Sequence, residues 1–181
     1  MQEPLVKYSG DHKRLLCYQK CEVIYDITYY FAHTFLQRGD RTIDQMVQAA
    51  RSGKQNIIEG NADLATSVEM AIKLLNVAKA SLKELLADYE DFLRVNGYLQ
   101  WPVGSKEYEA MRKISAHGDN NKIVEIVKSR PANIVANMAI ILIKHADFLL
   151  FRYIESLSER FTREGGFKER MYHYRIRERK S

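Results

Sequence analysis

The spacing of apolar residues along the chain is that of helices almost throughout. Between residues 11 and 36, apolar or small side chains recur at alternating intervals of four and three: Cys17, Cys21, Ile24, Thr28, Phe31 and Phe35. This spacing keeps one stripe of a helix facing a partner. No segment shows the alternation of apolar and polar residues that is typical of a half-buried strand. The pattern therefore predicts an all-α protein.

Capping and turn residues divide the pattern into further helices. We expect a second helix over residues 42–60, where Thr42 and Gln45 form a capping-box pair. A third is expected over residues 66–95, where Thr66 and Glu69 form the same kind of pair. The inner face of the second helix is predicted to be Ile43, Met46 or Val47, Ala50 and Ile57. That of the third is predicted to be Leu74, Leu75, Ala78, Leu82, Leu85, Leu86, Tyr89 and Leu93.

The second half of the chain predicts two short helices, 105–116 and 121–129, and one long helix. Pro131 is suited to the first position of the long helix, which we expect to reach residue 161. Its inner stripe is predicted to be Ile134, Met138, Ile141, His145, Phe148, Arg152 and Glu155, widened by Val135, Leu142 and Leu149. The four long helices predict an antiparallel up-down four-helix bundle over residues 1–162, with a short helical insertion at 102–130.

Composition and charge sharpen this picture. With only 9 Gly and 3 Pro in 181 residues, the chain lacks the turns that a β-sandwich needs, and 46% hydrophobic residues supply a core. The net charge is +5, yet residues 163–181 alone carry seven basic and three acidic side chains. The bundle is therefore almost neutral and the excess charge lies in a basic C-terminal tail.

The same features bear on the cellular compartment. Two cysteines do not make a secreted disulfide framework, and the first residues show no signal peptide. The most apolar segment, residues 134–151, is interrupted by Asn137, Lys144, His145 and Asp147, so we expect a buried helix that does not cross a membrane. The expected location is the cytoplasm.

The second and third predicted helices resemble the bacterial four-helix-bundle family that is named for proteins encoded in 23S rRNA intervening sequences. The second helix matches the family pattern at Gln45, Ala49, Ala50, Ser52, Asn56, Ile57, Glu59 and Gly60. The third matches at Ser67, Glu69, Lys73, Leu74, Ala78, Ser81, Glu84, Leu85 and Tyr89. The chain departs from the pattern at Gln48, at Gly53-Lys54, in the insertion 102–130 and in the tail.

This resemblance implies a protein without catalytic activity. The family is similar to the accessory proteins of diversity-generating retroelements, which form pentameric barrels and bind RNA and a reverse transcriptase. A homopentamer is therefore the assembly that the resemblance implies, and RNA binding is a second implied property.

Several groups of residues could form chemical sites. Cys17 and Cys21 are four residues apart and could share a metal, but no further ligand is within reach, so we interpret them as core residues and expect no metal or cofactor. His145 is expected to be a buried, hydrogen-bonded histidine. Ser52-Gly53-Lys54 lacks the glycine and hydroxyl positions of a phosphate-binding loop.

The second and third predicted helices could bring four polar residues near each other where they meet: Asn56, Glu59, Glu69 and Lys73. One interpretation is a buried network that fixes helix register or assembly. The alternative is a carboxylate site built on Glu59 and Glu69. Because no Glu-x-x-His pattern accompanies them, we favour the structural or assembly role. Small neighbours, Ala49, Ala50, Ser52 and Gly53, would also let another helix approach closely.

The tail interleaves aromatic and basic residues. Candidate nucleic-acid contacts are Arg170, Tyr172, Tyr174, Arg175, Arg177, Arg179 and Lys180. The alternatives are a solvated tail, or an amphipathic helix with Phe167, Met171 and Tyr174 docked on another subunit. The sequence thus predicts a cytoplasmic, non-catalytic homo-oligomer that acts as a binding or scaffold protein. The alternative function is an RNA-binding accessory protein that uses the tail, and an enzyme is the third.

Overall fold

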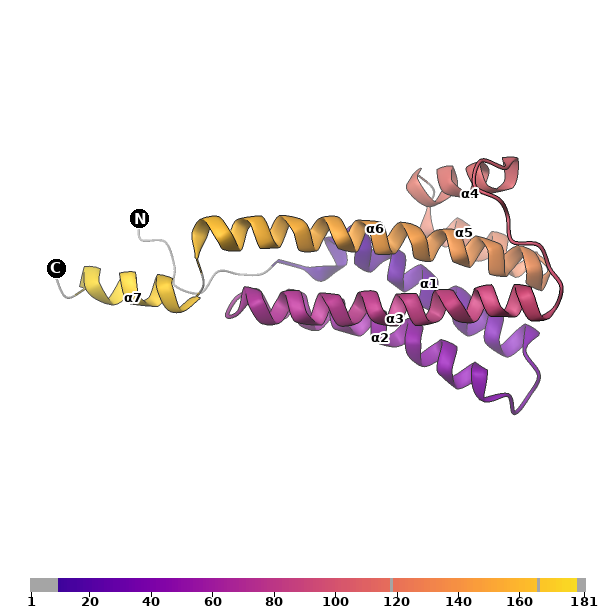
Figure 1. The fold of residues 1–181 in the computed structure, drawn as a ribbon, viewed down its shortest axis with the longest axis horizontal. Coiled ribbons are helices and arrows are strands. Elements are labelled where there is room, and N and C mark those ends of the chain that lie inside the picture. Colours follow the sequence, from indigo (N-terminus) through magenta and orange to yellow (C-terminus); the bar gives the residue numbers. More distant parts are fainter. Residues whose placement is uncertain (1–9, 118, 166, 179–181) are drawn as a thin grey trace.

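A computed structural model describes residues 10–117, 119–165 and 167–178 of the chain (Figure 1). These residues form a short 3-10 helix, His12–Arg14, followed by seven α-helices, and they contain no strand. The helices are α1 (Leu16–Phe35), α2 (Arg41–Asp63), α3 (Val68–Val95), α4 (Lys106–His117), α5 (Asn120–Lys128), α6 (Ala132–Glu164) and α7 (Phe167–Glu178). The all-α prediction is confirmed.

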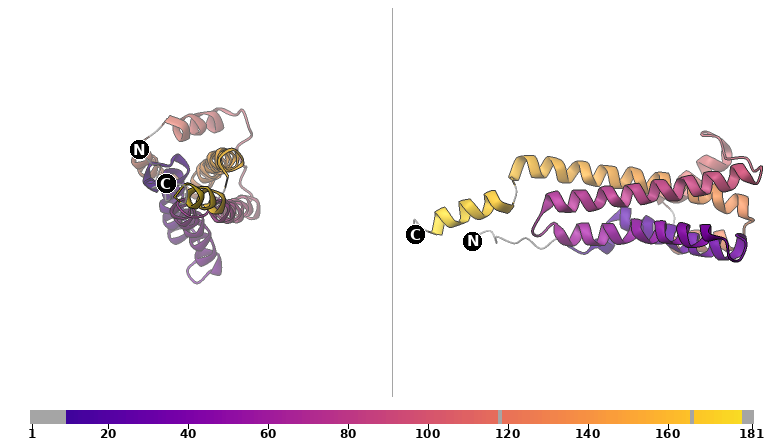
Figure 2. Two further views of the ribbon diagram at one scale, coloured as in Figure 1. Left: turned by 90° about the vertical axis from the view of Figure 1, so that its left-hand side faces the viewer. Right: turned by 60° about the horizontal axis from the view of Figure 1, so that its bottom comes forward.

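The four longest helices, α1, α2, α3 and α6, share one core. Each packs against two of the others, because α2 contacts both α1 and α3 while α6 closes the set against α3 and α1. Of the two short helices, α4 packs on α6 and α5 packs on α1. Figure 2 shows the long helices side by side, with α7 beyond their ends.

The predicted core positions of the first three long helices are largely correct. Cys17, Cys21, Ile24 and Phe31 of α1 are almost fully buried, as are Met46, Ala50 and Ile57 of α2. Tyr89 of α3 is completely buried, and its hydroxyl donates a hydrogen bond of 3.1 Å to the Thr28 hydroxyl of α1. Polar Thr28 can therefore lie in the apolar stripe, because its hydroxyl is paired inside the core.

The predicted inner stripe of the last long helix is wrong in its second half. Phe148 is 58% exposed and the Arg152 side chain is 63% exposed, whereas Ala146, Leu150 and Leu157 are buried. The first half of α6 is apolar over two adjacent stripes, since α4 covers the outer one. Apolar residues at intervals of three and four therefore fit either stripe in this half of the helix. Beyond residue 146, only the stripe that faces α1 and α3 stays buried.

Helix starts also differ from the predicted capping boxes. Asp40, not Thr42, caps α2, because its carboxylate accepts a 2.9 Å hydrogen bond from the Thr42 amide. Ser67, not Thr66, caps α3 by accepting from the Met70 amide. In both cases a neighbouring residue with a higher N-cap preference than Thr, Asp40 or Ser67, occupies the N-cap, so the prediction gave too much weight to the capping-box pair. Pro131 directly precedes the first residue of α6.

Among the described helices, α6 alone is long and apolar enough to cross a membrane when judged by length and composition. Its most apolar window has a mean hydropathy of 1.8, and 61% of that window is buried inside the protein. The core helix of a soluble protein meets the same criterion, so this property alone does not distinguish the two kinds of helix.

Candidate interaction groove between α2 and α3

The closest helix contact joins α2 and α3 through small residues. A Cβ atom on Gly60 would lie 3.1 Å from the Ala71 carbonyl oxygen, and one on Gly53 would lie 3.3 Å from a methyl carbon of Leu82. At the same contact the Ser81 hydroxyl donates a 2.9 Å hydrogen bond to the Ser52 hydroxyl. These small residues let the two helix backbones approach, and the serine pair fixes their register.

The polar group predicted at this helix pair is not assembled as expected. Asn56 donates to the Ser52 carbonyl at 2.9 Å and thus stays on its own helix. Lys73 and Glu69 form an exposed ion pair at 2.8 Å within α3, and Glu59 is exposed on α2. A buried network of Asn56, Glu59, Glu69 and Lys73 within one chain is therefore wrong. The physical reason is that Glu59 and Glu69 lie on the outward sides of their helices.

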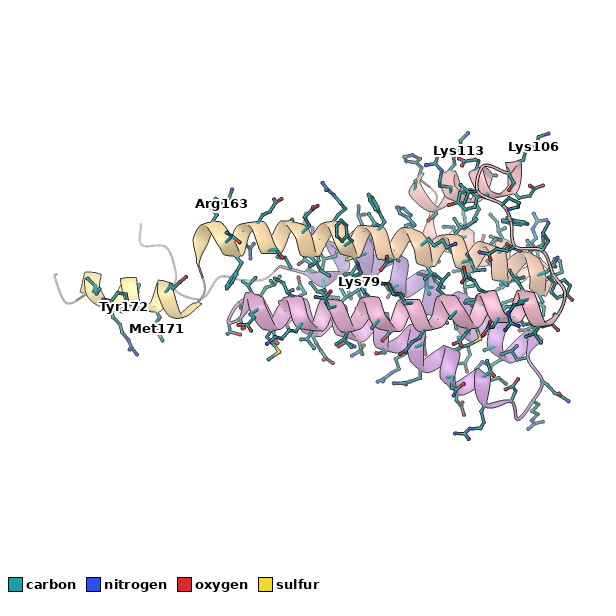
Figure 3. The ribbon with its side chains drawn as sticks, in the orientation of Figure 1. Lys79, Lys106, Lys113, Arg163, Met171 and Tyr172 are labelled. Carbon is teal, nitrogen blue, oxygen red and sulfur yellow. The ribbon has the colours of Figure 1, made fainter. Side chains whose placement is uncertain are left out.

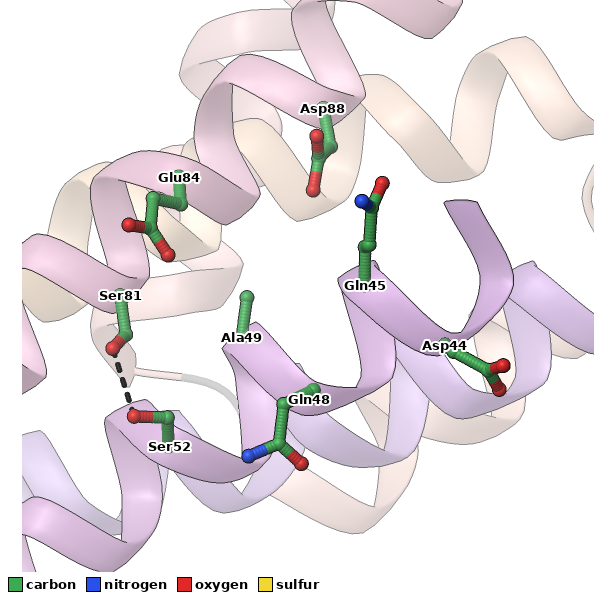
Figure 4. A pocket seen from close by; sticks show the side chains of 8 residues that line it. All are labelled: Asp44, Gln45, Gln48, Ala49, Ser52, Ser81, Glu84 and Asp88. Carbon is green, nitrogen blue, oxygen red and sulfur yellow. Dashed lines mark hydrogen bonds between the residues drawn. The ribbon is translucent and has the colours of Figure 1, made fainter. Parts of the chain in front are cut away.

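Next to the serine pair, the outer surface of α2 and α3 is hollowed into a groove, which we call the α2–α3 groove (Figure 4). Its volume is about 650 Å³. Side chains from both helices line it: Asp44, Gln45, Gln48, Ala49, Ser52, Ser81, Glu84 and Asp88. Ala49 and Ser81 are buried and short and form its floor, and longer polar side chains stand around them.

Helix periodicity places these residues on one face. Gln45, Ala49 and Ser52 are separated by four and three residues on α2, and Ser81, Glu84 and Asp88 by three and four on α3. Residues with these separations share one side of a helix. The acidic side of this face was not among the predicted sites, because its small residues were interpreted as packing positions only. The signal that could have found it is the run of acidic residues that follows Ser81.

The groove is acidic. Its ionisable lining residues are Asp44, Glu84 and Asp88, and no lysine, arginine or histidine of the described part of the chain lines it. Burial raises the pKa of Asp88 above its ordinary value, and repulsion from Asp91 and Glu84 raises it further. The arrangement therefore favours a cationic partner, which would relieve this repulsion.

A second groove, which the sequence analysis also missed, lies on the outer face of α1 beside α5. Its volume is about 560 Å³, and its lining includes Tyr25, Tyr29, His33 and Lys128. The rings of Tyr29 and His33 are stacked with their centroids 4.2 Å apart. Because the rings stack on each other along the helix, they form a self-packed ladder rather than an open stacking platform.

The predicted histidine and cysteines occupy structural positions. His145 is half-buried, and its Nδ1 lies 2.7 Å from the Ser115 hydroxyl of α4. Ser115 is completely buried, so a substrate could not reach it, and the pair instead ties α4 to α6. Cys17 and Cys21 are in the core, where burial raises the pKa of Cys17 to about 11 and that of Cys21 still further. No three His, Cys, Asp or Glu side chains of the described residues come together as a metal site.

Some of the predicted nucleic-acid contacts of the tail belong to α7. Tyr172 is 63% exposed, Tyr174 is 37% exposed, and Arg175 is exposed (Figure 3 labels Tyr172). Arg170 and Arg177 belong to the same helix, while Arg179 and Lys180 lie outside the described residues. Gly165 directs the chain from α6 into α7 with a φ of 71°, and the Glu169 carboxylate occupies the place that a Cβ would take. A side chain at residue 165 would thus be strained and obstructed.

Comparisons of the chain with protein-family models, with curated proteins and with solved structures found no match.

Proposed function

We propose that this chain is a non-catalytic, homo-oligomeric binding or scaffold protein. In this proposal α1, α2, α3 and α6 constitute an antiparallel up-down four-helix bundle, α4 and α5 are an insertion, and α7 is an appended interaction helix. The observation that carries the proposal is the α2–α3 groove. Its short floor side chains, Ala49 and Ser81, leave room for another helix, and the described residues that line it include acidic side chains but no basic one.

The remaining expectations follow from the sequence. The resemblance to the 23S rRNA intervening-sequence family makes a pentamer the assembly to test first, and the small number of cysteines favours a cytoplasmic location. We propose no cofactor. The finding that would reopen an enzymatic role is zinc or iron in stoichiometric amount in the purified protein.

A second candidate function is RNA binding through α7. It is favoured by one observation, the exposure of Tyr172, Tyr174 and Arg175 on a helix that lies beyond the ends of the long helices. Arginines neutralise phosphates and tyrosines stack on unpaired bases. Affinity for a single-stranded RNA should then fall steeply with salt, and should be lost in the combined variant Tyr172→Ala, Tyr174→Ala, Arg175→Ala. RNA binding that this variant leaves unchanged would refute the candidate.

The primary proposal is tested by the mass of the chain in solution. Gel filtration coupled to light scattering at micromolar concentration should give a multiple of the 21.1 kDa chain mass. A monomer under these conditions would refute the scaffold function.

A further inference from the structure

The helix α7 is too short to be stable without a surface to pack on. It has 12 residues, which is about 18 Å of helix, and isolated helices of this length are marginal in water. Figures 1 and 2 show it beyond the ends of α2, α3 and α6, in the direction away from the body of the protein. None of the four long helices of its own chain lies alongside α7 in these views, so a surface that stabilises it has to lie elsewhere.

The positive charge of α7 and its flanking residues favours an acidic partner surface. Residues 163–181 carry seven of the chain's 28 basic residues and only three of its 23 acidic ones. Arg175 is exposed on α7. An acidic surface of helical width would stabilise this segment, whereas a basic or apolar surface would leave its charges unpaired.

The α2–α3 groove has these properties. Among the residues for which the structure gives a position, only acidic side chains, Asp44, Glu84 and Asp88, bring charge to the lining, and Asp88 is already repelled by its acidic neighbours. Along α2 the groove extends from Asp44 to Ser52, which corresponds to about 12 Å, or two turns of a docked helix. Short side chains on its floor allow a third helix to approach α2 and α3 closely.

The chain cannot fill its own groove with α7. The groove includes the start of α2, beside the α1–α2 connection, whereas α7 follows the far end of α6 (Figure 1). These two features lie toward opposite ends of the long helices. A contact between them must therefore join two copies of the chain.

We propose that α7 of one copy docks in the α2–α3 groove of a second copy, where arginines of α7 pair with Glu84 and Asp88. This inference rests on the proposed homo-oligomeric function and names the contact that builds the oligomer. Since the two surfaces differ, copies joined in this way either exchange their α7 helices reciprocally as a dimer or follow one another around a closed ring.

A charge-swap experiment on the full-length chain tests the contact. Reversing the helix (Arg170→Glu, Arg175→Glu, Arg177→Glu) or the groove (Glu84→Lys, Asp88→Lys) should each weaken self-association by roughly 100-fold, because like charges then face each other. Combining both reversals should restore association to within roughly tenfold of the original. The matched control is Lys106→Glu with Lys113→Glu on α4, which should leave the mass unchanged (Figure 3).

Sedimentation velocity over a concentration series measures these constants, and circular dichroism checks that each variant is folded. A second measurement needs no variant: raising NaCl from 50 to 500 mM should weaken association of the natural chain by at least roughly tenfold. Association that survives the α7 reversal, or that the double reversal does not restore, overturns the inference while leaving the oligomer in place. Loss of RNA binding upon α7 reversal with no change in mass also overturns it. A natural chain that is monomeric refutes the proposed function itself.

Discussion

Replacement of Lys20 by methionine should make the protein more stable. Lys20 of α1 is only 7% exposed, and its ammonium group donates a 2.9 Å hydrogen bond to the Asn120 side chain of α5. Burial lowers the pKa of this lysine, and no carboxylate forms an ion pair with it among the described salt bridges. The ammonium group therefore loses solvation in the folded state without gaining an opposite charge in exchange.

The size of the effect follows from two opposed contributions. Removing a buried, unneutralised ammonium group relieves its desolvation, and losing its hydrogen bond offsets that gain by about 1.5–3 kcal/mol. Methionine preserves most of the packing volume. We expect a net gain of about 1 kcal/mol in the free energy of unfolding, which is about 2–4 °C in Tm for a chain of this size. The exposed Lys122 of α5 is the matched control, and Lys122→Met should change stability by less than about 0.5 kcal/mol.

The same substitution should change the titration of His145. Burial lowers the pKa of His145 from its ordinary value of 6.5, and the charge of Lys20 lowers it further. The unfolded chain thus binds this proton more readily, so stability is lost as the pH falls below about 6.5, down to the folded pKa. In Lys20→Met the His145 pKa should rise toward 6.5 and this acid-dependent loss should shrink.

Urea unfolding between pH 5 and pH 8 measures the stability, and NMR of the imidazole protons measures the pKa. A Lys20→Met protein that is less stable by 1 kcal/mol or more, with an unchanged His145 pKa, would refute the reasoning. That result would mean that the Lys20 charge stabilises the junction of α1, α4, α5 and α6.

Three further sets of substitutions test the packing by urea unfolding. Tyr89→Phe should lower the free energy of unfolding by about 1 kcal/mol, and Thr28→Val should lower it by about 2 kcal/mol because it leaves the buried Tyr89 hydroxyl without its acceptor. The double variant should lose less than the sum of the two, and strict additivity would contradict the hydrogen bond. Asn137→Ala should cost about 2–3 kcal/mol because the buried Asn137 side chain pairs with the Trp101 amide and the Leu99 carbonyl, and a cost below about 0.5 kcal/mol would show that water replaces it. Gly60→Ala should cost about 1–3 kcal/mol because the new Cβ meets the Ala71 backbone. Gly53→Ala should cost less, because its tight contacts are with the Leu82 side chain, which can shift. The reverse order would contradict the close approach of α2 and α3.

The helices could be predicted from the sequence because each has a stripe of apolar residues at helical spacing. The stripe containing Cys17, Cys21 and Ile24 is buried as predicted, and Val23 and Ile27 beside it are buried too. The apolar residues of α6 can be assigned to either of two stripes. The choice between them depends on α4, a separate helix that packs on α6. Tertiary contacts of this kind are not contained in the local period, which is why Phe148 was misplaced.

The candidate site was less predictable than the fold. Asn56, Glu59, Glu69 and Lys73 belong to the right pair of helices, but the prediction placed the outward-facing carboxylates in a shared buried network. The side chains that do join α2 to α3 are Ser52 and Ser81, two short residues whose spacing alone does not identify them. The α2–α3 groove arises only when both helices are placed, because neither Asp44 nor Asp88 signals a surface by itself.

The most direct test of the central claim is the mass of the full-length chain before and after the charge of α7 is reversed. In low salt and at micromolar concentration, light scattering should report a multiple of 21.1 kDa for the natural sequence. The variant Arg170→Glu, Arg175→Glu, Arg177→Glu should shift toward 21.1 kDa, and adding Glu84→Lys and Asp88→Lys should bring the multiple back. A mass of 21.1 kDa for the natural chain would contradict the proposal that this protein is built to assemble with itself.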